Sequence, residues 1–136
     1  MRQTGVPMQR RRFLSTLFAT AAGVALTARA PAAPRPRRLI QESPLAGFQY
    51  HAGERLWNEL REGDTLTLVR EPGNPYDPRA VRVDWKTEKL GYLPRIENTA
   101  VSQMLDRGER LVTRIVRLRT NNDPWERLLL SVELEL

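Results

Sequence analysis

Hydrophobic and polar residues alternate in short runs along the second two-thirds of the chain, and turn-forming residues separate these runs. An alternation with a period of two is typical of strands that bury one face. Residues 55–61 break the pattern and could form an irregular turn or one short helix. The pattern predicts six short strands, at residues 45–51, 65–69, 80–85, 89–93, 110–119 and 125–134.

One segment has the longer period of a helix. Pro94 suits the first helical turn, where a missing backbone N–H costs nothing, and Gly108 marks the end. Between them an apolar stripe is predicted from Ile96, Ala100 and Met104, with Val101 and Leu105 beside it. Six strands and one main helix indicate a mainly β fold. A small barrel or a strongly bent sheet is expected, since an open sheet of this size would expose its edges.

The net charge of +6 comes mostly from the N-terminal part of the chain. Residues 1–32 hold five of the 22 basic residues and no acid, which leaves 17 bases against 16 acids. Without Arg35, Arg37 and Arg38 the rest has 14 bases against 16 acids. The domain is therefore slightly acidic, and any site for an anion must be a local patch.

The composition excludes several classes of enzyme. The chain has no cysteine and one histidine, His51, so thiolate nucleophiles, zinc sites built on cysteine and histidine-rich metal centres are excluded. No phosphate-binding loop of the Walker type and no serine nucleophile elbow is present. We expect a protein that is not an enzyme, with no catalytic residues, no metal and no cofactor.

The N-terminal stretch QRRRFLSTLFATAAGVALTARAPAAP combines a basic start, a mildly apolar run and small residues at its end. It resembles a twin-arginine export signal. We expect a signal peptide over residues 1–32, a Pro/Arg-rich linker over residues 33–44 and a domain over residues 45–136. This implies an exported protein of the periplasm or cell envelope, with no stable transmembrane span after cleavage. An uncleaved anchor, or a misassigned start and a cytoplasmic protein, are the alternatives.

Three blocks of the domain carry a resemblance to a family: LAGFQYHAGERL, GDTLTLVREPGNPYDPRAVRV and KLGYLPR followed by a helix. They resemble the successive blocks of the HIRAN domain, a small OB-like, or SH3-like, β-barrel. The resemblance covers about residues 45–134. It implies a nucleic-acid-binding module that recognises the 3′ end of single-stranded DNA, in a pocket between the first strand and the Asn-Pro-Tyr-Asp turn.

The residue types in these blocks suit that chemistry. Aromatic rings can stack on an unpaired base, a carboxylate can accept a hydrogen bond from a terminal sugar hydroxyl, and an arginine near the start of a helix favours a phosphate. Prolines at 72, 75 and 78 would hold the turn rigid, so little entropy is lost on binding. Gln49 and His51 depart from the Arg and Tyr that are common in the DNA-binding members. The implied nucleic-acid-binding residues are Gln49, Tyr50, His51, Asn74, Tyr76, Asp77 and Arg95.

Most of these residues also have a structural alternative. Tyr76 and Asp77 could simply close the turn, with Asp77 accepting backbone hydrogen bonds. In a strand Tyr50 faces away from its two neighbours, so it could belong to the core, while His51 and Arg95 could be solvated surface residues. The three tryptophans are expected to pack in the core, although Trp125 could also lie at the rim of a groove.

The sequence is compatible with two different functions. The Asn-Pro-Tyr-Asp turn favours a module that binds single-stranded DNA. The export signal and the nearly neutral domain favour an envelope protein whose same pocket binds a peptide, a glycan or a partner protein. A salt dependence of binding would separate these functions, because neutralising DNA phosphates releases counterions, while a neutral ligand should show little dependence on salt.

Overall fold

The structure is a computed structural model that describes Gly23 and residues 30–136. The export signal predicted over residues 1–32 lies outside the described residues, except for Gly23 and residues 30–32. None of the helices described is both long enough and apolar enough to cross a membrane.

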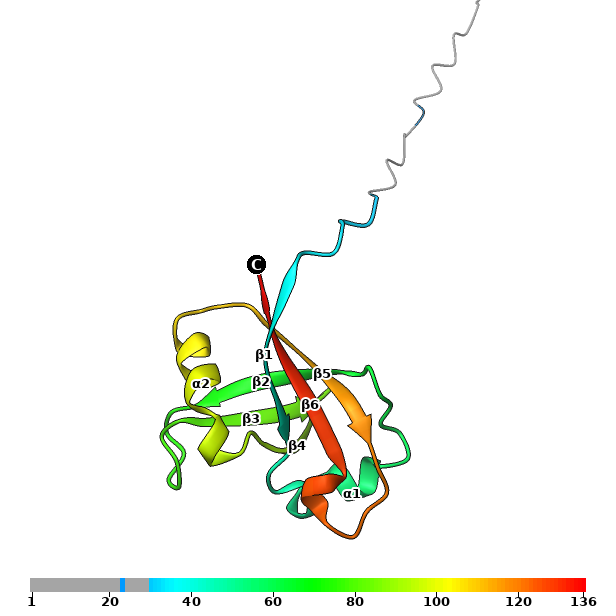
Figure 1. The fold of residues 1–136 in the computed structure, drawn as a ribbon, viewed down its shortest axis with the longest axis vertical. Coiled ribbons are helices and arrows are strands. Elements are labelled where there is room, and N and C mark those ends of the chain that lie inside the picture. Colours follow the sequence, from blue (N-terminus) through cyan, green and yellow to red (C-terminus); the bar gives the residue numbers. More distant parts are fainter. Residues whose placement is uncertain (1–22, 24–29) are drawn as a thin grey trace, which may run out of the picture. The chain divides into compact units, whose positions relative to one another are not determined.

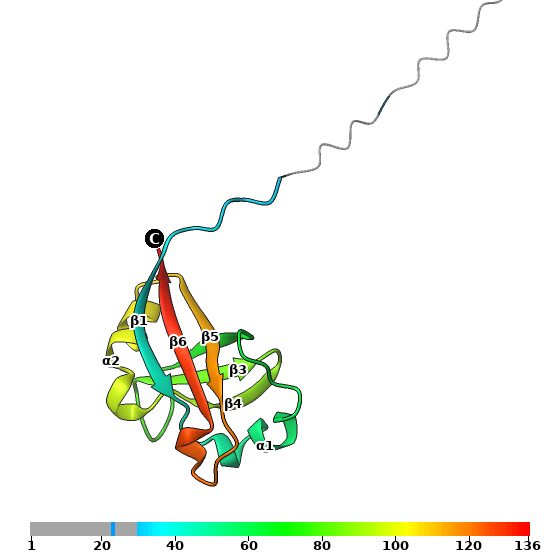
Figure 2. The ribbon, with the colours of Figure 1, turned by 45° about the vertical axis from the view of Figure 1, so that its right-hand side comes forward.

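Six antiparallel strands form one sheet in the order β1-β6-β5-β2-β3-β4. β2 and β3 run across the direction of β5 and β6, so the sheet is strongly bent (Figures 1 and 2). This confirms the mainly β fold with one main helix, consistent with an OB-like fold. The strands are β1 (Arg37–Pro44), β2 (Thr65–Glu71), β3 (Ala80–Trp85), β4 (Glu88–Tyr92), β5 (Leu111–Leu118) and β6 (Leu128–Glu135).

The predicted barrel is not closed, because β1 and β4 lie at opposite ends of the strand order. An isolated bridge between Ala46 and Tyr92 joins the chain that follows β1 to the end of β4. Its two hydrogen bonds, from Ala46 N to Tyr92 O and from Tyr92 N to Ala46 O, are 2.8 and 2.9 Å long. The bridge brings the two ends of the sheet together without a continuous ladder.

The first predicted strand, residues 45–51, is wrong. The chain turns at Gly47, whose φ of 74° favours glycine, and then forms the short 3₁₀ helix η1 (Phe48–Tyr50). The fully buried Phe48 packs edge-on against Trp57, with ring centroids 5.8 Å apart, and this contact anchors η1. Residues 55–61 start inside the one-turn helix α1 (Gly53–Leu56) and continue as turns.

The linker predicted over residues 33–44 is wrong for residues 37–44, which form the edge strand β1. This strand pairs with β6, and a β-bulge interrupts the register between Leu39 and Gln41. Charged side chains suit an edge strand, since they discourage pairing with another chain. Arg37 forms an ion pair with Glu133 of β6 at 4.0 Å.

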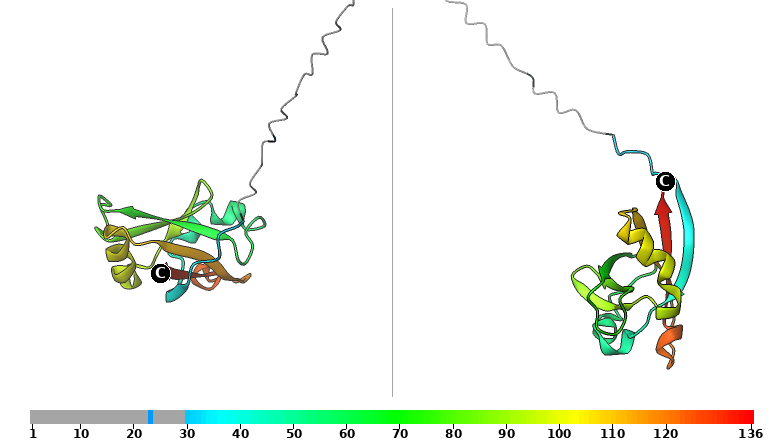
Figure 3. Two further views of the ribbon diagram at one scale, coloured as in Figure 1. Left: turned by 90° about the horizontal axis from the view of Figure 1, so that it is seen from above. Right: turned by 90° about the vertical axis from the view of Figure 1, so that its left-hand side faces the viewer.

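The main helix α2 (Thr99–Asp106) lies beside the end of β2 and the start of β3, apart from α1 (Figures 1 and 3). It follows the 3₁₀ turn η2 (Arg95–Glu97). Val101 is buried in the core as predicted. The predicted stripe is wrong at its first two positions, because Ile96 belongs to η2 and is 91% exposed, and Ala100 is exposed on α2.

The β5–β6 connection contains a third 3₁₀ turn, η3 (Pro124–Glu126), so Trp125 lies before β6 and not within it. The hydrophobic core includes side chains from every strand except β1, and its buried members are Leu45, Phe48, Leu56, Leu60, Leu66, Val81, Val83, Trp85, Leu90, Leu93, Val101, Ile115, Leu128, Leu130 and Val132.

Candidate nucleic-acid interface

The turn between β2 and β3 is held by the side chain of Asn74. Its Oδ1 accepts hydrogen bonds from the backbone N–H groups of Tyr76 (2.9 Å) and Asp77 (3.2 Å). Its Nδ2 donates to Glu71 Oε1 at 3.2 Å. The structure thus uses the side-chain oxygen of Asn74 and one of its amide hydrogens inside the turn.

Asp77 is 8% exposed and joins the turn to α2. Its Oδ1 accepts from the backbone N–H of Arg79 at 2.9 Å, and its Oδ2 accepts from Asn98 Nδ2 at 2.7 Å. This is the structural role that was one alternative for Asp77. A carboxylate has about four acceptor sites, so accepting these two bonds does not exclude a further donor.

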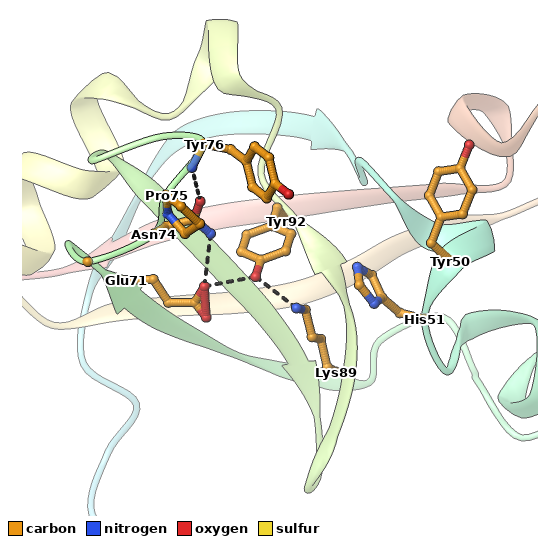
Figure 4. A pocket seen from close by; sticks show the side chains of 9 residues that line it. Tyr50, His51, Glu71, Asn74, Pro75, Tyr76, Lys89 and Tyr92 are labelled. Carbon is orange, nitrogen blue, oxygen red and sulfur yellow. Dashed lines mark hydrogen bonds between the residues drawn. The ribbon is translucent and has the colours of Figure 1, made fainter.

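An open groove of about 1030 Å³ lies beside this turn. Its walls are aromatic: Tyr76 stands on one side and Tyr50 with His51 on the other, while Tyr92 lies between them (Figure 4). Tyr50 and Tyr76 are 79% and 84% exposed, so the alternative that Tyr50 belongs to the core is wrong. The groove is lined by Tyr50, His51, Glu71, Gly73, Asn74, Pro75, Tyr76, Lys89 and Tyr92.

A polar network crosses this groove. The Tyr92 hydroxyl donates to Glu71 Oε1 at 2.8 Å and accepts from Lys89 Nζ at 2.8 Å (Figure 4). Sequence reasoning missed all three residues. Glu71 ends β2, whereas Lys89 and Tyr92 lie on β4, and β3 separates the two strands. No local pattern of the sequence joins them; pairing both strands with β3 is what brings them together.

A smaller pocket of about 240 Å³ adjoins the groove. Tyr76, Asn74 and Tyr92 line both spaces, while Asp77 and Arg95 line the smaller one. The structure therefore places six of the seven predicted residues around two adjoining pockets. Gln49 is exposed and lines neither pocket.

Two of the three tryptophans pack in the core, and the third is exposed. Trp85 is buried and donates through Nε1 to Asp64 Oδ2 at 3.1 Å, and Trp57 packs on Phe48. The packing role predicted for these two tryptophans is confirmed. Trp125 on η3 is exposed, so the packing role predicted for it is wrong.

The carboxylates of Glu71 and Asp77 both have a lowered pKa. Burial opposes ionisation of Glu71, but the hydrogen bonds from Tyr92 and Asn74 and the charges of Arg82 and Lys89 outweigh it. For Asp77 burial is again outweighed, by the hydrogen bonds from Arg79 and Asn98 and by nearby arginine charge. Burial and the charge of Lys89 lower the pKa of His51, so its imidazole is neutral at pH 7.

These shifts predict a loss of stability in acid. A carboxylate whose pKa is lower in the folded chain stabilises the fold fully above its ordinary pKa, and this contribution is lost as the pH falls through the folded pKa. The ordinary values are 4.5 for Glu71 and 3.8 for Asp77. We expect the free energy of unfolding, measured with urea, to fall as the pH drops below these values. Glu71→Gln should reduce this dependence, and an unchanged dependence would contradict the role of Glu71.

The sequence and the fold of this chain are similar to those of known proteins. A family described as "HIRAN domain" matches residues 40–136. The crystal structure of a protein from Lactobacillus plantarum is similar with a TM-score of 0.63 and 28% identity, over 74% of this chain and 98% of that one. The HIRAN domain of human HLTF has the same fold, with a TM-score of 0.53 and 17% identity, over 72% of this chain and 76% of that one.

Among curated proteins, a Fanconi-associated nuclease 1 homolog from rice, Oryza sativa subsp. japonica, is 33% identical over 73 residues. The match covers 51% of this chain and 7% of the rice protein. The chain thus spans only a small part of the curated relative that it matches.

Proposed function

The chain belongs to the HIRAN domain family, a family of DNA-binding modules, and on this premise we propose that its groove binds the 3′ end of single-stranded DNA. The observation that carries the proposal is the pair of exposed tyrosines, Tyr50 and Tyr76, on opposite sides of a groove with a polar centre. Exposed rings that do not pack on the protein are available to stack on unpaired bases.

The smaller pocket suits the terminal sugar. Asp77 lines it and keeps acceptor capacity beyond its two hydrogen bonds, so it can accept from a free 3′ hydroxyl. Arg95 lines the same pocket and can pair with a phosphate. A phosphate at the 3′ end would place negative charge beside the ionised Asp77, so we expect a preference for the free hydroxyl.

The two tyrosines provide the first test of this function. Tyr50→Ala and Tyr76→Ala are each expected to weaken binding by about 1–3 kcal/mol, or roughly 5- to 150-fold, because each loses one stacking surface. Fluorescence anisotropy with a short labelled oligonucleotide and the full chain measures this. Tyr50→Phe and Tyr76→Phe keep the rings and should bind like the wild type. Equal binding by the alanine and phenylalanine variants would contradict stacking.

A second titration compares oligonucleotides with a free and a phosphorylated 3′ end, at two salt concentrations. Preference for the free end, with affinity that falls as salt rises, supports recognition of a DNA end. The same affinity for both ends would reject end recognition but not DNA binding. No binding at low salt would reject the proposed function and favour another ligand of the same pockets, such as a peptide or a glycan.

Export of the protein is a separate proposal that rests on the twin-arginine-type pattern of residues 1–32. Cell fractionation of the full chain, with Arg10, Arg11 and Arg12 replaced by lysine as the control, tests it. Accumulation of the wild type outside the cytoplasm, and retention of the variant, is the expected result.

A further inference from the structure

Lys89 is the single lysine or arginine among the residues that line the groove. Its Nζ donates to the Tyr92 hydroxyl at 2.8 Å and lies 4.5 Å from the centre of the Tyr92 ring. Within residues 30–136, no carboxylate forms an ion pair with Lys89, whereas Arg82 pairs with both Glu71 and Asp84. The ammonium group is thus held in place by a neutral partner.

The network around Tyr92 explains why this ammonium keeps its free donors. The Tyr92 hydroxyl donates its hydrogen bond to Glu71, so the lone pairs of its oxygen are available to accept from Lys89. Glu71 is the acid that lines the groove, and its oxygens already accept from Tyr92, Asn74 and Arg82. An ammonium has three N–H donors, and one is used, which leaves two for a ligand.

Among the residues that line this groove, no other side chain offers a positive charge to an anion. Gln49 stands where the DNA-binding members commonly have Arg, and it does not line the groove. Arg95 lines the smaller pocket only. His51 is the remaining basic side chain on the groove, and its imidazole carries no charge at neutral pH.

We propose that Lys89 binds a backbone phosphate of the DNA strand in the groove, in place of a contact from position 49. The inference rests on the proposed function, because it names the side chain that holds the backbone of the same ligand. Figure 4 shows Lys89 between Tyr92 and His51, where a phosphate next to a base stacked on Tyr50 or Tyr76 would be within reach of its ammonium.

The dependence of binding on salt tests this role. Lys89→Gln is expected to weaken binding of a short single-stranded oligonucleotide about tenfold at low salt, since a hydrogen bond to a charged group is lost. It should also reduce the slope of log K against log salt by about 0.7, the value for one phosphate contact on a single strand. A residue that only packs on Tyr92 would not change this slope.

The chain offers a matched control, because Lys86 and Lys89 are its only lysines. Lys86 also lies over an aromatic ring, with Nζ 4.2 Å from the centre of Trp85, but it does not line the groove. Lys86→Gln removes the same charge from the same domain. It should leave both the affinity and the salt slope within about twofold of the wild type, as expected for an exposed charge that does not line the groove.

A second measurement needs no variant. Acetylation of the full chain with and without the oligonucleotide, followed by mass spectrometry, reports on both lysines at once. The oligonucleotide should protect Lys89 and leave Lys86 reactive. Equal protection of both, or of neither, would overturn the inference.

The outcomes separate this inference from the proposed function. If the wild type does not bind the oligonucleotide, the proposed function fails and the role of Lys89 fails with it. If the wild type binds, while Lys89→Gln keeps the affinity and the slope and Lys89 is not protected, only this inference is overturned.

Discussion

Gly91→Ala is expected to lower the free energy of unfolding by about 4 kcal/mol, from overpacking and the loss of two hydrogen bonds. A Cβ at this position would lie 2.3 Å from the backbone oxygen of Ala46 and 3.1 Å from Leu45 Cγ. A backbone oxygen cannot move aside as the end of a flexible side chain can, so the Ala46–Tyr92 bridge must open. Urea unfolding of the purified chain measures the change.

The bridge also positions the groove. Tyr92 is one of the two bridge residues and lines the groove, and η1, which carries Tyr50, begins directly after Gly47. Gly91→Ala should therefore weaken DNA binding as well, even where the chain is still folded. Gly73→Ala is the matched control: Gly73 lies on the same groove, but a Cβ added there would have no atom of residues 30–136 within 4 Å. It should keep its stability within about 0.5 kcal/mol of the wild type. A similar loss in both variants would show that the bridge is not the cause.

Asp77→Ala is expected to cost about 3 kcal/mol of stability, because it removes two hydrogen bonds to a charged group and leaves a buried amide without its acceptor. That amide is Asn98 Nδ2, and the Asn98 side chain is fully buried. A loss of DNA binding in this variant would therefore not by itself show that Asp77 contacts the ligand.

Asp77→Asn separates the role of Asp77 in stability from a direct contact of its carboxylate with DNA. The Oδ1 of Asn98 is buried and has no hydrogen-bond partner among the described residues, so after rotation of its amide it can accept from the new side chain. We expect this variant to lose only about 1 kcal/mol. If it remains folded and no longer distinguishes a free from a phosphorylated 3′ end, the carboxylate has a direct role in binding.

The control for the loss of charge is Asp106→Ala. Asp106 forms an ion pair with Arg70 at 3.0 Å, but its side chain is 53% exposed. Exposed pairs of this kind contribute about 0–1 kcal/mol. If unfolding experiments give Asp77→Ala and Asp106→Ala the same small loss, then Asp77 does not stabilise the turn as its contacts indicate.

Much of the fold was predictable because it depends on local patterns. The alternation of Thr65 to Val69 and of Ala80 to Trp85 identified β2 and β3, and Gly108 marked the end of α2. The turn at Asn74 was predictable for the same reason, since proline and Asx residues act over a few neighbours. These features are determined by the sequence itself.

The first strand was mispredicted because its residues are shaped by contacts from far along the chain. Phe48 looks like a strand residue, but Gly47 turns the backbone, and the bridge from Ala46 to Tyr92 sets its direction. β1 shows no regular alternation in its burial, and it is a strand because β6 offers it an edge. Pairing of distant segments, rather than propensity, decides both cases.

In the candidate site, too, some features depend on local sequence and others on contacts between distant segments. The sequence by itself determined the turn with Asn74, Tyr76 and Asp77 and the aromatic character of residues 50 and 51. Only the tertiary structure placed Lys89 and Tyr92 beside Glu71 and left Gln49 outside the groove. The physical reason is that contacts between strands depend on register and on the order of strands in the sheet, which arise from the packing of the whole domain.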